Sequence, residues 1–408
     1  MTYWERAKAQ IEAHKEQAFN INFELAAHPE ISGQEEQSAR YISSILEGAG
    51  IPISRELSGV THSFRGQVIK GDTTTGLMIH GRKGLRRPRL AILCEYDALP
   101  NIGHGCGHCA SGSISTLAAL TLKGLDAALK AEGAEGLPMD VDIIGTPDEE
   151  ATGGKVDLVK AGEFDEYDFA IMVHMDGVES RANSAFLALD CYRIAFHGVP
   201  AHAAGEPWNG VNALNGMNLA FQAIDMLRQQ TRPETRIGYY VINGGNASNV
   251  IPEYAEFELC VRHTERAYLD TLVYKITNCV KGAALATGTT YEMNMYGNSF
   301  DDMKWNEAGT ALIEQVYEEL AIPHKTGKPT DLGSSDIGNV SKICPAFHPT
   351  LRLKGADKVC HTIEFAQAMT EPTIKTSIEE GASIIVKTLL HLMETPDTLK
   401  AIKAEFEG

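Results

Sequence analysis

A thiol and an imidazole stand close together in a glycine-rich segment of the chain. The segment Asn101-Ile-Gly-His-Gly-Cys-Gly-His-Cys carries Cys106 and His108, two residue types that commonly bind metal. An apolar run typical of a buried strand precedes it, and a helix-forming segment follows. Because open α/β sheets place their sites at the carboxyl ends of strands, a metal site is expected here. A redox pair of Cys106 and Cys109 is the alternative.

Four more candidate ligands come later in the chain. Glu149 and Glu150 follow an apolar strand at 139–145, His174 ends another strand, and His361 lies further on. Thiolate, imidazole and carboxylate together bind zinc, with manganese or cobalt as alternatives. One tetrahedral ion cannot use all these ligands, so a pair of ions is expected, with one glutamate left off the metal. That carboxylate can take a proton from water and pass it to a leaving nitrogen.

Composition narrows the class of protein. The 408 residues carry a net charge of −18, which argues against nucleic-acid partners and against binding to an anionic membrane. No run of 18 apolar residues and no signal-peptide pattern is visible, and the eight cysteines are scattered, so we expect reduced thiols in a cytoplasmic protein. The motifs of serine hydrolases and of dinucleotide-binding turns are missing from the sequence.

The order of predicted elements indicates a catalytic domain with an insertion. Residues 1–184 alternate strands and helices, which predicts a mostly parallel sheet. Ser32 and Glu35 have the spacing of a capping box at the start of a helix. Residues 185–298 read strand–helix–strand–strand–helix–strand, the split βαβ layout of a separate domain. Residues 299–408 are expected to complete the catalytic domain.

Eight segments along the chain resemble those of a known family. They are His28-Pro-Glu-Ile-Ser, Glu95-Tyr-Asp-Ala-Leu-Pro, Gly103-His-Gly-Cys-Gly-His, Gly145-Thr-Pro-Asp-Glu-Glu, Ala201-His-Ala-Ala, Asn249-Val-Ile-Pro, Gly333-Ser-Ser-Asp-Ile-Gly-Asn-Val-Ser and His361-Thr-Ile-Glu-Phe. Through them the chain resembles, essentially end to end, the dinuclear metal-dependent aminoacylase and carboxypeptidase (amidohydrolase) family. The similarity is to the branch of auxin-conjugate hydrolases, p-aminobenzoyl-glutamate hydrolase and related dipeptidases.

The resemblance implies a mostly parallel α/β catalytic domain of the metallo-aminopeptidase type. It also implies an inserted ferredoxin-like α+β lid through which two subunits dimerise. Two divalent ions are implied, zinc first and manganese or cobalt as alternatives. The ligands carried over from the family are Cys106, His108, Glu150, His174 and His361.

Roles for other residues also follow from the resemblance. Glu149 is similar to the general base, and His202 to the lid residue that stabilises the developing oxyanion, often across the dimer. Asn249 and Arg262 resemble lid groups that hold the carboxylate of the substrate. In the segment that begins at Glu95, Asp97 is expected to orient a ligand, whereas Glu95 need not bind metal.

The main hypothesis is a cytoplasmic, homodimeric enzyme that hydrolyses an amide bond in an N-acyl or N-aroyl amino acid or a dipeptide and releases a free amino acid. A dipeptidase for unusual, β-alanyl-type dipeptides is an alternative on the same fold. A catalytically silent metal-binding or regulatory protein is another. Glu149 argues against a silent protein, since metal binding alone needs no additional carboxylate at that position.

Overall fold

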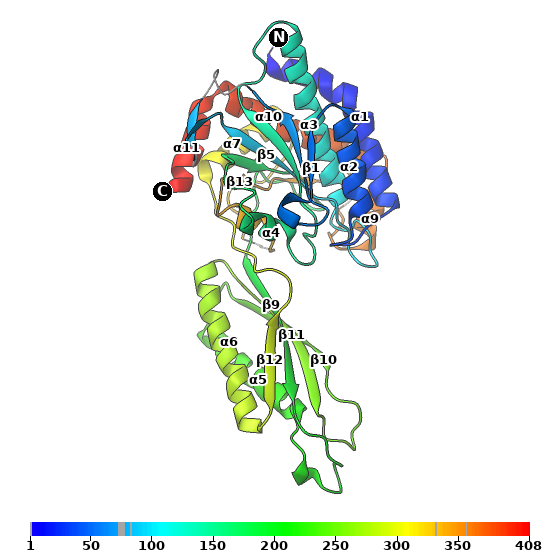
Figure 1. Ribbon diagram of the computed structural model, residues 1–408, viewed down its shortest axis with the longest axis vertical. Coiled ribbons are helices and arrows are strands. Elements are labelled where there is room, and N and C mark those ends of the chain that lie inside the picture. The colour runs from blue at the N-terminus through cyan, green and yellow to red at the C-terminus, as the bar shows by residue number, and fades with distance from the viewer. Residues whose placement is uncertain (1, 72–77, 82–83, 331–332, 356) are drawn as a thin grey trace. The chain divides into compact units, whose positions relative to one another are not determined.

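The computed structural model describes residues 2–71, 78–81, 84–330, 333–355 and 357–408. The chain forms two compact units (Figure 1). The first comprises residues 1–185, 303–331 and 339–408, and the second comprises residues 186–302 and 332–338. A short helix, α8 (Ile337–Val340), lies at the last division in the sequence.

The first unit is an α/β fold. Its helices are α1 (Tyr3–Ala27), α2 (Glu36–Gly48), α3 (His108–Ala131), α4 (Gly154–Lys160), α7 (Glu307–Glu319), α9 (Ile363–Ala368), α10 (Ile374–Glu394) and α11 (Pro396–Glu407). Its strands are β1 (Ile53–Arg55), β2 (Phe64–Ile69), β3 (Ile79–Gly81), β4 (Gly84–Arg86), β5 (Arg89–Cys94), β6 (Asp140–Gly145), β7 (Phe169–Ile171), β8 (His174–Asp176), β13 (Ala346–Phe347) and β14 (Thr350–Arg352).

The central sheet of this unit has the strand order β1-β2-β6-β5-β7-β13. The pairs β6–β5, β5–β7 and β7–β13 are parallel, while β1 and β2 join antiparallel at one edge. The prediction of a mostly parallel sheet is therefore confirmed. Strands β8 and β14 form a separate parallel pair beyond β7 and β13.

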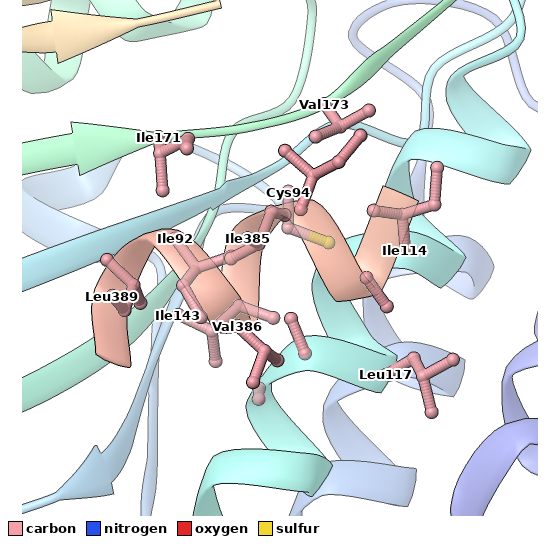
Figure 2. Packing of buried hydrophobic residues seen from close by; sticks show 14 of the residues in the cluster. Ile92, Cys94, Ile114, Leu117, Ile143, Ile171, Val173, Ile385, Val386 and Leu389 are labelled. Carbon is pink, nitrogen blue, oxygen red and sulfur yellow. The ribbon is translucent and has the colours of Figure 1, made fainter. Parts of the chain in front are cut away.

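Continuous apolar runs explain why the central strands lie inside the fold. Five of the six residues of β5 are buried, as expected for a parallel strand covered on both faces. Helices α3 and α10 pack closely, because Gly381 on α10 leaves room for Ile114 on α3. A Cβ atom at position 381 would lie 2.6 Å from the Cδ1 atom of Ile114. Figure 2 shows this core, with Ile92, Cys94, Ile143 and Ile171 near Ile114, Leu117, Ile385, Val386 and Leu389.

The second unit has the split βαβ order that the sequence predicts. Its elements are β9 (Ala188–His197), α5 (Ala213–Leu227), β10 (Arg236–Asn243), β11 (Tyr254–His263), α6 (Arg266–Thr287) and β12 (Thr290–Met295). The sheet has the order β10-β11-β9-β12 and is antiparallel throughout, which is the ferredoxin-like arrangement. The unit has a hydrophobic core of its own between this sheet and its two helices.

Two cysteines differ from the expectation of reduced thiols. Cys191 and Cys260 are direct partners in the register of β9 and β11 and form a disulfide. That expectation is wrong for this pair because sequence spacing alone does not reveal cross-strand neighbours. Cys106 and Cys109, which the alternative of a redox pair would join, are both free thiols in this structure. Among the described residues, no helix combines the length and apolarity needed to cross a bilayer.

The separate core predicts that residues 186–302 fold without the rest of the chain. Their two ends meet, because the backbones of Leu189 and Phe300 exchange two hydrogen bonds of 2.9 Å each. The isolated segment should unfold cooperatively in a circular dichroism melt. Ile276 is fully buried, so Ile276→Ala should lower the free energy of unfolding by about 2–5 kcal/mol in denaturant titration. A segment without a cooperative transition would contradict an independent core.

Candidate metal centre

The residues predicted as metal ligands follow β5, β6, β7 and β14 in the chain and come together in the first unit. Their ligand atoms form groups in which all atoms lie within 4.8 Å of one another. These groups are Cys106–His108–His174, Cys106–Glu150–His361 and His108–Glu149–Glu150. The structure thus brings together all five predicted ligands and Glu149. Cys106, His108 and Glu150 each belong to two of these groups, so the groups share donors.

Local backbone geometry sets the direction of these side chains. Gly107 caps α3 with φ +84°, and a Cβ there would lie only 3.0 Å from Met175, so the turn requires glycine. His361 also has a positive φ, of 66°, and its N–H donates to the carbonyl of Gly105 at 2.7 Å. This hydrogen bond joins the segment before α9 to the turn that carries Cys106.

A buried carboxylate orients His108. Asp97 Oδ1 lies 2.7 Å from His108 Nδ1, and Oδ2 accepts hydrogen bonds from Ser32 Oγ at 2.7 Å and the Glu150 N–H at 3.0 Å. Burial alone would raise the pKa of Asp97, but the positive charge of His108 and these hydrogen bonds outweigh burial, so the pKa lies well below its usual range. Asp97 contacts His108 as expected, while the role of His108 as a metal ligand stays a prediction. A carboxylate behind a histidine is the usual support of a metal-binding imidazole.

Buried polar atoms without hydrogen-bond partners test whether the site suits a metal. Within the described part of the chain, His108 Nε2 and Glu150 Oε1 are buried and have no such partner. They lie 4.0 Å apart, and His361 Nε2 is 3.6 Å from Glu150 Oε1. Because an orphaned buried polar atom costs free energy, this arrangement is satisfied best by a cation placed among the donors.

The arrangement around the thiol of Cys106 also suits a metal ion. His174 Nδ1 faces the carbonyl of Met175 at 2.6 Å, which turns Nε2 toward Cys106 Sγ at 3.3 Å. Burial raises the pKa of the Cys106 thiol well above its ordinary value. A bound metal would displace the thiol proton. The donor set of one sulfur, three imidazoles and carboxylates suits zinc and related transition metals.

A buried ion pair beside His108 was missed from the sequence. Lys155 is fully buried, and its Nζ donates to Glu95 Oε1 at 2.6 Å. Glu95 Oε2 lies 3.3 Å from His108 Nε2. Burial would raise the pKa of Glu95, but Lys155 and then His108 lower it, so this carboxylate stays ionised. A lysine in the first turn of a buried helix was the available signal, since such a charge requires a counter-charge.

The capping box expected at Ser32 and Glu35 is wrong. Ser32 donates to Asp97 instead, and Glu35 makes no cap for α2. Glu35 Oε1 accepts the N–H of Gly33 at 2.9 Å and that of Asp148 at 2.8 Å. Burial, and then the charge of Asp97, raises the pKa of Glu35 to about 7. Tertiary contacts therefore outcompete the local cap, and Glu35 contacts the loop that carries Glu149.

The predicted lid residues lie in the second unit. His202 is exposed, and its Nδ1 accepts N–H groups from Ala204 at 3.2 Å and Gly205 at 2.9 Å, which leaves the proton on Nε2. The carbonyl of Asn249 accepts the N–H of Ala203 at 2.9 Å, so Asn249 lies beside the His202 loop.

Arg262 lies near the other end of β11 from Asn249. Its guanidinium makes no ion pair with a described carboxylate, and burial lowers its pKa. Arg266, the nearby arginine, is bound to both oxygens of Asp190 at 2.9 and 2.8 Å. Of these two arginines, Arg266 is held by a carboxylate, whereas Arg262 has no ion pair with a carboxylate in the described part of the chain.

Comparison with known proteins places the chain in a family. A model of the M20 peptidase dimerisation domain matches residues 189–287. Over 335 residues the chain is 34% identical to the Xaa-Arg dipeptidase of Mus musculus, covering 79% of this chain and 74% of that protein. It is 29% identical to one of the subunits of p-aminobenzoyl-glutamate hydrolase from Escherichia coli (strain K12), covering 76% and 68% of the two chains.

A solved structure shows the same fold. It is that of a dinuclear metal-binding peptidase of the M20 family from Bacillus subtilis, with a TM-score of 0.64, 18% identity and coverage of 92% of this chain and 99% of that one. The identity and coverage shared with the mouse dipeptidase extend the match beyond the fold. The chain therefore belongs to the M20 peptidase family and is a hydrolase of amide bonds.

Proposed function

We propose that the protein cleaves the amide bond of an N-acyl amino acid or dipeptide with two divalent metal ions and a glutamate base. The observation that carries the proposal is the convergence of one thiol, three imidazoles and two glutamates around buried atoms that lack hydrogen bonds among the described residues. Cys106, His108 and His174 would hold one ion, and Cys106, Glu150 and His361 the other. Zinc suits these ligands best, and manganese or cobalt are alternatives.

In this proposal, different residues of the chain have different roles in the reaction. Two divalent ions in this site would lower the pKa of a water molecule and polarise the scissile carbonyl. Glu149, within 4.8 Å of ligand atoms of His108 and Glu150, would take the proton of that water and deliver it to the leaving nitrogen. His202 Nε2–H would donate to the developing oxyanion. Arg262 and Asn249 would hold the carboxylate of the substrate.

The names of two relatives suggest which substrates to test first. The mouse protein is named an Xaa-Arg dipeptidase and the bacterial one a p-aminobenzoyl-glutamate hydrolase. Both names describe an amide between an acyl group and an amino acid. Dipeptides ending in arginine and N-aroyl glutamates are therefore the first compounds to test here, ahead of β-alanyl dipeptides.

We also propose that residues 185–298 form a lid that joins two copies of the chain. Strand β10 is an edge strand with Tyr240, Val241 and Ile242 exposed, a surface suited to pairing with a second copy. Asn249 precedes β11, and Arg262 lies eight residues after its first residue, about 26 Å along the strand. Asn249 and Arg262 of one lid are therefore too far apart to bind the same substrate carboxylate. This separation favours a site that takes His202 and Asn249 from the partner.

The first test is a substrate panel combined with metal analysis. We expect about two transition-metal ions per chain by elemental analysis and release of a free amino acid from at least one N-acyl amino acid or dipeptide. Cys106→Ser should lose metal and activity together, because Cys106 contributes to both clusters. Full activity in metal-free Cys106→Ser would rule out the proposed chemistry.

The second test separates the two adjacent glutamates. Glu149→Gln keeps the shape but cannot accept a proton, so it should retain both ions while turnover falls at least about a hundredfold. Glu150→Gln should lower metal occupancy, and excess metal should restore part of its activity. Turnover and metal content are measured together for both variants. Metal loss in Glu149→Gln with full occupancy in Glu150→Gln would reverse the assignment.

The third test asks whether His202 acts across a dimer. His202→Ala and Arg262→Ala should each be nearly inactive. If His202 comes from the partner and Arg262 does not, unfolding and refolding the two variants together should restore about a quarter of the wild-type activity, since half of the dimers are mixed and each has one intact site. If each of the two variants also carries Val241→Lys on β10, the refolded mixture should be monomeric in light scattering and inactive. Leu285→Lys, an exposed change on α6, is the control and should not prevent the recovery of activity. No recovery in the mixture would place both residues on the same subunit.

A further inference from the structure

The loop between β6 and α4 is held by two buried carboxylates on either side of Glu149. Glu35 Oε1 accepts the N–H of Asp148 at 2.8 Å, and Asp97 Oδ2 accepts the N–H of Glu150 at 3.0 Å. Both carboxylates are almost completely buried. The backbone is thus fixed at the residue before Glu149 and at the residue after it.

One side of this loop borders a cavity. Pro147, Asp148 and Gly154 line a cavity of about 580 Å³, whose lining also includes Val60 and Lys160. Asp148 has φ +62°, a left-handed conformation that a non-glycine residue adopts at a cost in energy. Its carbonyl accepts the N–H groups of Gly153 at 2.8 Å and Gly154 at 3.2 Å, which closes the loop on itself without tying it to the core. The hydrogen bond to Glu35 ties the loop to the buried interior at Asp148, as the hydrogen bond to Asp97 does at Glu150.

Glu35 is not needed for the helix that it precedes. The first turn of α2 is capped by Glu30, whose carboxylate accepts the N–H of Gln37 at 3.1 Å and the N–H and Oγ of Ser38 at 2.7 Å each. Glu35 instead turns away from α2, and its Oε2 has no hydrogen-bond partner among the described residues. The two glutamates, five positions apart, therefore have different roles. Glu30 caps α2, and Glu35 binds the loop between β6 and α4.

We infer that Glu35 is a positioning residue for catalysis, which sets the place of the general base Glu149 by accepting the N–H of Asp148. The inference rests on the proposed function, in which Glu149 is the base. In the proposed mechanism, Glu35 binds neither substrate nor metal. Its effect reaches the reaction through one backbone hydrogen bond and the conformation of Asp148.

The test compares Glu35→Met, which fills the space but accepts no hydrogen bond, with Glu35→Gln, whose amide oxygen still accepts one. Glu35→Met should lower kcat about tenfold to a hundredfold, because the base is misplaced, with KM and metal content unchanged. Glu35→Gln should stay within about threefold of the wild type. Glu30→Ala is the matched control: it should lower the melting temperature and leave kcat unchanged. If Glu35→Met does not fold, Glu35→Leu takes its place in the same comparison.

Two further readouts separate positioning from general stability. Amide hydrogen exchange in peptides covering residues 146–154 should accelerate in Glu35→Met and not in Glu30→Ala. In the Glu149→Gln background, Glu35→Met should lower turnover no further, since the base is already absent. Unchanged kcat or unchanged loop exchange in Glu35→Met would overturn the inference. Full turnover in Glu149→Gln alone would instead overturn the assignment of the base, so the two failures are distinguishable.

Discussion

The buried carboxylate of Asp97 accepts hydrogen bonds from three separate segments of the chain. It receives Ser32 from the turn before α2, His108 from the start of α3, and the backbone of Glu150 from the loop after β6. Because every one of these groups donates to the same carboxylate, the imidazole and the glutamate loop cannot be placed independently. A charged group in this position is stable only while its partners remain, which makes the site rigid.

The charge around this carboxylate is unusually concentrated for a buried region. Glu95 lies close to Asp97 in the chain and is compensated by the buried Lys155, while Glu149 and Glu150 lie at the same edge of the sheet. The positive charges of Lys155 and His108 do not balance the four carboxylates of Glu95, Asp97, Glu149 and Glu150. The excess of negative charge suits a pair of divalent cations, and it agrees with buried atoms of His108 and Glu150 that lack hydrogen bonds in the described structure.

The two units meet different physical demands. The first needs a rigid sheet edge, and it obtains one from apolar strands buried on both faces. The second has its own core and leaves an edge strand with exposed apolar side chains, which is a liability unless another chain covers it.

Much of the architecture could be predicted from local patterns in the sequence. Continuous apolar runs such as Leu90 to Leu93 indicated buried parallel strands, and the strand–helix order after residue 185 indicated the ferredoxin-like unit, because both patterns are written in neighbouring residues. Most of the candidate ligands could be identified too, since Cys106, His108, Glu150 and His174 follow the ends of predicted strands and parallel strands share one edge. His361 follows no predicted strand, and its assignment rests on the family resemblance.

Tertiary structure decided what depends on partners far apart in the chain. The capping-box spacing at Ser32 was misleading because Asp97, 65 residues away, offers its hydroxyl a buried carboxylate. The Cys191–Cys260 disulfide, across 69 residues, and the Lys155–Glu95 pair, across 60, have no local signature. Sequence by itself determined which residue types stand at the ends of strands. Only folding decided which of their hydrogen bonds are satisfied, because that depends on distances between segments that no local spacing encodes.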